Sequence, residues 1–291
     1  MASVLSLMTS AVGAQLASTL PPGFVYLRSV DSTIVQDIRY ASSINFTGVR
    51  VPGYDAPECI LLREAADALK QIQDELRDRY LSLKVYDCYR PQRAVQAFVD
   101  WVKNPNGKGV KRFYPNVARR DLISFGYIAA ASAHAKGAAV DLTLVPLPRK
   151  PVAVIEPGAT YGPCFAPKAE REPDESLDMG TTFDCFDHLS RNPAIAASIA
   201  TIVTQGAANP HPSIKGVAKQ ADTTTDPAKV DIAPLDITAE QRALRTTLNE
   251  IMTKHGFRGI SAEWWHFGYF GIKHPLQSLD FPIVLDGDAP R

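Results

Sequence analysis

Apolar residues recur every three or four positions over residues 58–80, and this spacing predicts an amphipathic helix. The segment that follows, LSLKVYDCY at 81–89, alternates and is rich in β-forming residues, so we expect a strand there. Pro91 suits the first position of a second helix, which we expect to run to about Val102. Arg90 therefore lies at a strand end just before a helix, and residues at such junctions often point into a cleft.

A similar pattern continues in the second half of the chain. AAVDLTLVPL, at 138–147, is typical of a strand that a proline ends. Thr238 and Gln241 form a capping box for a third helix, and Gly256 is typical of the residue after its end. The aromatic segment at 259–270 again has strand character. This order favours an α+β fold, a single domain with a mostly antiparallel central sheet flanked by helices, although periodicity alone leaves parallel pairing open.

Three stretches fall outside this pattern. The first 20 residues carry no charge and fit either a secretory signal peptide shortened at its basic end or a disordered tail. Residues 146–176 are rich in proline and charge, so we expect an inserted loop, and residues 191–235 lack periodicity, so we expect a surface excursion. The sequence thus predicts one domain over residues 21–291 with two insertions.

Composition and charge narrow the function classes. Hydrophobic residues make up 45% of the 291 positions and charged residues 21%, which is typical of a globular domain. Lys+Arg and Asp+Glu both number 31, so no basic excess points to nucleic acid or to an acidic membrane surface as a partner. No run of 18 apolar residues is present, so we expect no membrane span. No pattern indicates an oligomeric state.

The four cysteines bear on the compartment. None lies in a C-x-x-C pair, which argues against a zinc ribbon or a thioredoxin-type site. An even number together with the signal-like leader favours an oxidising compartment, the periplasm or the outside of the cell, with the cytoplasm as the alternative. Four cysteines allow three disulfide pairings or none. They are Cys59, Cys88, Cys164 and Cys185.

Candidate chemistry begins in SAHAKGAAVDLTL at 132–144, where His134 and Asp141 enter an otherwise small and apolar stretch. A hydrogen-bonded core pair is one interpretation. Metal binding is the other, because catalytic zinc takes three protein ligands from His and carboxylates and keeps one position open. His134, Asp141 and His266 would make such a set. Glu263, three residues before His266, is then placed to touch a metal-bound water.

The spacing of EWWH makes a structural demand. On a regular strand, residues three positions apart point to opposite faces. Glu263 and His266 can therefore serve one site only if the chain bulges or bends near Trp264. We predict such an interruption, and a straight unbroken strand there would contradict these roles.

Several motifs, taken together, resemble one enzyme family. SAHAKGAAVDLTL is similar to the S-x-H-x-x-G-x-A-x-D signature of the VanX-like zinc D-alanyl-D-alanine dipeptidases. Further segments resemble the family in the same order along the chain. These are RYASSINFTG, YDCYRPQRAVQAF, FYPNVARRDLISFGYIA, LDMGTTFDCF and EWWHF. The resemblance covers roughly residues 24–285 apart from the excursion at 191–235, and the combination of motifs is highly specific.

The resemblance implies a set of catalytic roles. It implies one bound Zn²⁺ with three ligands, His134, Asp141 and His266. Glu263 would act as general base and then as general acid, and Arg90 would face the oxygen of the scissile carbonyl. The alternative for Arg90 is a structural ion pair with a neighbouring carboxylate such as Asp87.

The resemblance also implies a substrate site and a function. Tyr40 and Asp184 would bind the free ammonium of a dipeptide, and Ser132 would contact the bound dipeptide. The implied reaction is hydrolysis of D-Ala-D-Ala to two D-alanines in cell-wall peptide metabolism. The implied fold is shared with hedgehog proteins and D,D-carboxypeptidases. The alternatives are a zinc D,D-carboxypeptidase acting on peptidoglycan stem peptides, a hedgehog-like binding module and a metal-stabilised structural domain.

The chain departs from part of this family. The vancomycin-resistance members have glycine where this chain has Cys88, and they lack the long insertion at 146–176. The members from Gram-negative bacteria are more similar, including at all four cysteines. This resemblance implies the disulfides Cys59–Cys88 and Cys164–Cys185 in an extracytoplasmic enzyme. The alternative is four free buried thiols.

Overall fold

A computed structural model describes residues 20–151, 154–156, 159–192 and 236–287. The expected leader at 1–20 and the expected excursion at 191–235 fall almost wholly outside these residues. None of the helices that the described residues form has the length and apolar character needed to cross a lipid bilayer.

The centre of the fold is a five-stranded sheet of order β2-β4-β5-β7-β6. The pair β2–β4 is parallel, and the pairs β4–β5, β5–β7 and β6–β7 are antiparallel. The predicted α+β domain with a mostly antiparallel sheet is therefore confirmed, with one parallel pair at the edge. The strands are β2 (Val35–Gln36), β4 (Leu81–Asp87), β5 (Ala139–Pro146), β6 (Phe257–Gly259) and β7 (His266–Tyr269).

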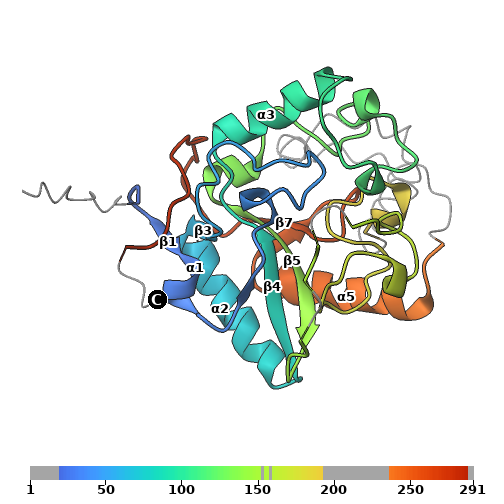
Figure 1. Cartoon of the computed structure of the whole chain (residues 1–291). Helices are drawn as coiled ribbons and strands as arrows, with labels where there is room; N and C mark the ends of the chain where they lie inside the picture. The colour runs from blue at the N-terminus through green and yellow to red at the C-terminus, as the bar shows by residue number, and fades with distance from the viewer. Residues whose placement is uncertain (1–19, 152–153, 157–158, 193–235, 288–291) are drawn as a thin grey trace, which may run out of the picture.

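Helices surround this sheet. In Figure 1 the long strands β4 and β5 lie side by side at the centre, with α2 on one side, α5 on the other and α3 near their upper end. A second sheet pairs β1 (Phe24–Tyr26) with β3 (Ile60–Leu62) in antiparallel fashion. The helices are α1 (Leu27–Val30), α2 (Arg63–Arg77), α3 (Gln92–Lys103) and α5 (Ala239–Lys254).

The predicted helix boundaries hold with two corrections. α2 begins at Arg63 rather than near residue 58, because Ile60–Leu62 form β3 instead. All three residues of β3 are buried, so an apolar run that also fits helical spacing is used for strand pairing with β1. Pro91 is the N-cap of α3 rather than its first helical residue.

The third helix agrees closely with its sequence signals. The capping box of Thr238 and Gln241 is formed in both directions at the start of α5. Gly256 follows the C-cap of α5 and has a φ of 87°, a left-handed conformation that glycine adopts without strain. The predicted strand at 259–270 is only partly correct, because the described chain forms β6, then bends, and returns as β7.

Strand register brings the site together. Asp87, the last residue of β4, lies opposite Asp141 of β5, and Asp141 lies opposite His266, the first residue of β7. Three functional positions therefore stand in a row across three adjacent strands. The register of β4 and β5 shifts between Val85 and Asp87, immediately before this row.

Two disulfides fasten the chain around the sheet. Cys59–Cys88 joins the residue before β3 to the residue after β4. Cys164–Cys185 lies within the irregular segment 159–192, which supplies no strand among its described residues. Both pairings implied by the resemblance are confirmed, and none of the four cysteines is free.

Candidate metal centre and substrate site

His134, Asp141 and His266 meet at one point. Each offers one ligand atom, and these three atoms lie within 4.8 Å of one another. His134 Nε2 is 3.1 Å from His266 Nδ1. Asp141 Oδ1 is 3.0 Å from His266 Nδ1 and 3.3 Å from His134 Nε2. The three residues predicted as ligands are therefore neighbours in space, although 132 positions separate the two histidines in sequence.

A short 3₁₀ turn, Ala133–Lys136, carries His134 back towards the sheet. Ser132 caps this turn, because its hydroxyl oxygen accepts a 3.2 Å hydrogen bond from the backbone N–H of His134. Gly137 ends the turn with a φ of 68°, and a Cβ at this position would collide with the ring of Phe24. Ser132, predicted as a substrate contact, thus has an observed role in orienting His134.

The tautomer of His134 suits metal binding. Its Nδ1 lies 2.7 Å from the carbonyl oxygen of Cys88, so Nδ1 carries the proton and donates it to that carbonyl. Its Nε2 then presents a lone pair to Asp141 and His266. A hydrogen bond from the far ring nitrogen to a carbonyl is the usual support of a metal-bound histidine.

Protonation states around the cluster also fit a cation. Burial raises the pKa of Asp141, but the neighbouring imidazoles of His134 and His266 outweigh burial and lower it below its usual range. Burial lowers the pKa of His266. A carboxylate and neutral imidazoles are the forms that bind metal ions. Among the residues that the structure describes, the group has two nitrogens, one oxygen and no fourth protein ligand, which matches a catalytic zinc site better than a closed structural one.

The predicted bend near Trp264 is confirmed. Residues 264 and 265 form a bend, and strand β7 begins only at His266. Glu263 is 8% exposed. Burial is the main cause that raises its pKa well above the usual value, and the negative charges of Asp141 and Asp184 add to it. A carboxyl group whose pKa is raised by burial and by the charge of a candidate metal ligand is suited to general acid–base chemistry.

Arg90 forms the ion pair with Asp87 that was one of its two interpretations, and it also lies close to the candidate ligands. Its Nε donates to Asp87 Oδ2 at 2.9 Å, and its Nη2 lies 2.8 Å from the same oxygen. The same Nη2 also approaches the cluster, because it is 3.5 Å from Asp141 Oδ2. The backbone N–H of Arg90 also donates to the carbonyl of His134 at 3.1 Å. Asp87 therefore anchors a cation that faces the metal ligands.

Tyr40 and Asp184 form a buried pair. The hydroxyl of Tyr40 donates to Asp184 Oδ1 at 3.0 Å, and only 2% and 3% of these two residues are exposed. Burial, followed by the charge of Asp141, raises the pKa of Asp184 well above its usual value. Its second oxygen, Oδ2, is buried without a hydrogen-bond partner. A carboxylate oxygen in this state would gain from a cationic ligand.

One residue of this site has a larger role than the sequence suggested. Asp87 is fully buried and, besides Arg90, accepts hydrogen bonds from the hydroxyl of Tyr54 at 2.6 Å and the backbone N–H of Cys88 at 2.9 Å. Its Oδ2 is 3.5 Å from His134 Nδ1. The sequence signal for Asp87 is an acidic residue three positions before an arginine at a strand end, which by itself predicts only a partner for Arg90.

Comparison with known proteins gives a consistent result. The sequence model of peptidase family M15, described as D-Ala-D-Ala dipeptidase, matches residues 21–151 and 228–283. D-alanyl-D-alanine dipeptidases of Enterococcus faecium and Streptomyces coelicolor are 28% and 29% identical over 262 residues, or 90% of this chain and 98% of each relative. That of Escherichia coli is 27% identical over 250 residues, or 86% of this chain and 83% of the relative.

The ranges matched by the family model contain most of the candidate site residues but not Asp184. M15 peptidases are metallopeptidases, in agreement with the cluster of ligand atoms. The three candidate ligands, Arg90 and Glu263 all lie within the matched ranges. Asp184 lies between them, in residues 152–227.

Proposed function

This chain belongs to the D-Ala-D-Ala dipeptidase family of M15 peptidases, and from that membership we propose that it is a zinc-dependent hydrolase of the free dipeptide D-Ala-D-Ala. The products are two D-alanines, and the reaction belongs to cell-wall peptide metabolism. The enzyme class follows from the family, whereas the metal, the substrate and the residue roles below are our proposal.

The observation that carries this substrate is the unpaired Oδ2 of buried Asp184. A free dipeptide has an ammonium group that can pair with this oxygen, while Tyr40 holds the other oxygen. An acylated or polymeric peptide has no charge at that position and would leave the carboxylate desolvated and unpaired, which costs several kcal/mol. The pair Tyr40–Asp184 thus favours free dipeptides over peptidoglycan stems.

The metal site fits Zn²⁺ held by three residues, His134, Asp141 and His266. A zinc ion there would supply Lewis acidity for the scissile carbonyl and would lower the pKa of water. Glu263 takes the proton from the attacking water and returns it to the leaving amine, a role worth roughly 10²–10⁴-fold in rate. Arg90, fixed by Asp87, stabilises negative charge on the carbonyl oxygen, and one such donor typically contributes about 3 kcal/mol.

The disulfides support a location outside the cytoplasm. Both cysteine pairs are oxidised, and structural disulfides persist in the periplasm and in secreted proteins. We therefore propose a periplasmic or secreted enzyme.

The test compares free D-Ala-D-Ala with N-acetyl-D-Ala-D-Ala as substrates of the zinc-loaded enzyme. We expect hydrolysis of the free dipeptide and little of the acetylated one. Asp184→Asn keeps the size of the side chain but removes its charge, and we expect kcat/KM for the free dipeptide to fall by at least about 100-fold. Equal hydrolysis of both substrates would indicate a D,D-carboxypeptidase. Zinc binding without hydrolysis of either would indicate a binding module.

A further inference from the structure

The backbone at Asp184 adopts a conformation that few residues other than glycine adopt. Its φ is 58°, in the left-handed region. For a non-glycine residue this costs on the order of 1–3 kcal/mol and persists only where the surroundings enforce it. Cys185, the next residue, is fully buried and bonded to Cys164. The backbone N–H of Phe186 donates to the carbonyl of Phe113 at 2.7 Å. The chain just after Asp184 is therefore firmly held.

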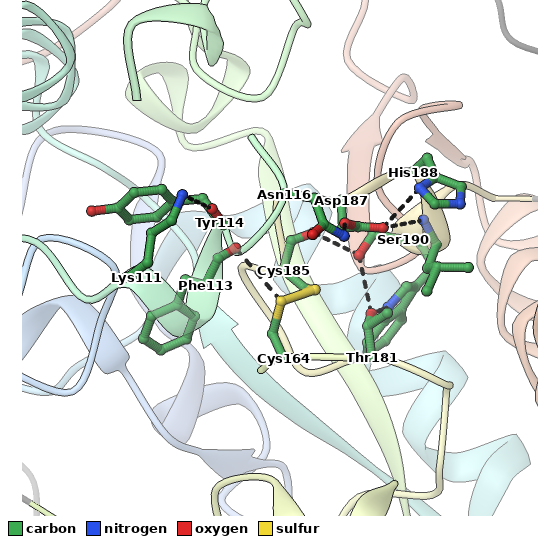
Figure 2. Close-up of a disulfide and its surroundings, with 12 residues drawn as sticks. Lys111, Phe113, Tyr114, Asn116, Cys164, Thr181, Cys185, Asp187, His188 and Ser190 are labelled. Atoms are coloured by element: carbon green, nitrogen blue, oxygen red, sulfur yellow. Dashed lines mark hydrogen bonds and ion pairs between the residues drawn. A yellow bond between two sulfur atoms is a disulfide. The ribbon is translucent and has the colours of Figure 1, made fainter. Parts of the chain in front are cut away.

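A chain of buried hydrogen bonds also ends at this point. Trp264 Nε1 lies 2.8 Å from Thr181 Oγ1, and Thr181 Oγ1 lies 3.1 Å from Ser190 Oγ. Ser190 Oγ in turn lies 2.6 Å from the carbonyl oxygen of Cys185. Figure 2 shows Thr181 and Ser190 beside the Cys164–Cys185 disulfide, with dashed lines along this path. Thr181, Ser190 and Trp264 are each at most 3% exposed.

The available protons determine which atom donates and which accepts in each hydrogen bond of this chain. The indole N–H of Trp264 can only donate, so Thr181 accepts from it. The carbonyl of Cys185 can only accept, so the single hydroxyl proton of Ser190 is used there. The remaining bond must therefore be donated by Thr181 to Ser190. Every donor points from Trp264 towards Cys185, and such aligned chains strengthen each member by polarisation.

This chain of hydrogen bonds links the segment that carries Glu263 to the segment that carries Asp184. Trp264 directly follows Glu263, and Cys185 directly follows Asp184. Ser190 joins them a second time, because its backbone carbonyl accepts from the N–H of Trp264 at 2.9 Å. Ser190 thus binds the segment of Asp184 through its side-chain hydroxyl and the segment of Glu263 through its backbone carbonyl.

We propose that Thr181 and Ser190 are positioning residues for substrate selection, because their hydroxyls set the place of the Asp184 carboxylate relative to Glu263. This inference rests on the proposed dipeptidase function. Neither hydroxyl touches the substrate. Their removal leaves the catalytic groups intact but loosens Asp184, so the loss falls on recognition of the free ammonium rather than on the chemical step.

The test uses Ser190→Ala and Thr181→Val, which remove one hydroxyl each with little change in shape. We expect each to raise KM for free D-Ala-D-Ala by roughly threefold to tenfold, the worth of one net hydrogen bond. We expect kcat to stay within about twofold, which marks lost binding rather than lost chemistry. The preference for free over N-acetylated dipeptide should fall by the same factor as KM rises, and bound zinc should not change.

Matched controls separate positioning from general damage. Thr181→Ser keeps the hydroxyl and should retain the preference. Ser82→Ala removes another buried serine hydroxyl, one that bonds Gln73 and Leu83 at the start of β4, away from the site. It should lower the melting temperature about as much as Ser190→Ala does, yet leave KM and the preference unchanged.

The outcomes distinguish this inference from the function on which it rests. A wild-type enzyme that does not prefer the free dipeptide overturns the proposed function and this inference with it. A wild-type preference that persists in Ser190→Ala and Thr181→Val overturns the inference alone. A fall in kcat with unchanged KM, or an equal loss of preference in Ser82→Ala, also overturns it.

Discussion

The site consists of two regions that are built differently. The catalytic region stands on the ends of β4, β5 and β7, where backbone pairing aligns Asp87, Asp141 and His266. The recognition region is the irregular segment 159–192, which carries Asp184 and is held in part by a disulfide and by side-chain hydrogen bonds. The first region inherits its geometry from the sheet, whereas the disulfide, side-chain hydrogen bonds and scattered backbone hydrogen bonds hold the second in place.

The difference shows in how the chain matches its family. The catalytic region lies within the matched ranges, and the recognition region lies in the gap between them. Backbone ladders tolerate changes of side chain better than a loop whose shape depends on side chains. We infer that substitutions in the recognition region change which substrate binds, while substitutions among the catalytic residues change the rate of the bond-breaking step.

Each region has a disulfide next to a functional residue. The carbonyl of Cys88 accepts the Nδ1 proton of His134, so Cys59–Cys88 fixes the support of a candidate metal ligand. Cys164–Cys185 fixes the residue after Asp184. On the proposed function, the two cross-links would therefore support different parts of the site, one the metal ligands and the other substrate recognition.

The largest expected effect comes from breaking the catalytic region alone. Glu263→Gln keeps the size of the side chain but cannot take a proton, so we expect kcat to fall by about 10²–10⁴-fold. Titration calorimetry should show that binding of free D-Ala-D-Ala and of zinc is retained. A fall in kcat of less than about tenfold would remove Glu263 from the role of general base.

A pair of double variants compares the two disulfides directly. They close sequence separations of 29 and 21 residues, so replacing either pair by serine should lower the free energy of unfolding by about 3 kcal/mol. Loss of Cys59–Cys88 should weaken zinc binding by roughly 10–100-fold, the usual effect of disturbing the support of a ligand. Loss of Cys164–Cys185 should raise KM and leave zinc affinity unchanged.

Denaturant unfolding, zinc titration and steady-state kinetics on both double variants measure these effects. Equal changes of zinc affinity in the two variants would show that the two regions are not separable. A stability loss in only one of them would mean that the other disulfide constrains little of the unfolded chain.

Local signals in the sequence predicted the backbone geometry around several candidate catalytic residues, whereas the roles of these residues rested on the family resemblance. Strand and helix patterns placed Arg90 at a junction, and the spacing of EWWH required the bend that the structure shows at Trp264. The apolar run Ile60–Leu62 fits both the helical period and a short buried strand, and the sequence pattern favours a helix. Only its pairing with β1 decides in favour of a strand.

The recognition region was less predictable from the residues alone. Asp184 came from the family resemblance, and Thr181 and Ser190 were missed, because a buried serine or threonine has no distinguishing pattern in sequence. Their partners lie far along the chain, since Thr181 bonds a tryptophan 83 positions away. Hydrogen bonds between side chains of irregular segments depend on tertiary packing, which periodicity does not report.

The smallest expected effect concerns the contact between the two regions. Asp174 belongs to the recognition region. It lies 3.3 Å from Lys84 Nζ and 3.3 Å from Arg39 Nη2 and accepts from the hydroxyl of Tyr86 at 2.8 Å. Burial raises the pKa of Asp174, but Lys84 and Arg39 outweigh burial and lower it from 3.8 to about 2. The carboxylate therefore stabilises the folded state by about 2 kcal/mol above pH 4, and this contribution is lost as pH falls from 4 through 2.

Asp174→Asn removes this titration, so the stability difference between wild type and variant should shrink by about 2 kcal/mol between pH 5 and pH 2. Any acid release of metal affects both proteins and cancels in the difference. Asp67→Asn is the matched control, because Asp67 forms only an exposed pair with Arg63 on α2, and such pairs contribute little. A difference that stays constant with pH would mean that Asp174 does not join the two regions electrostatically.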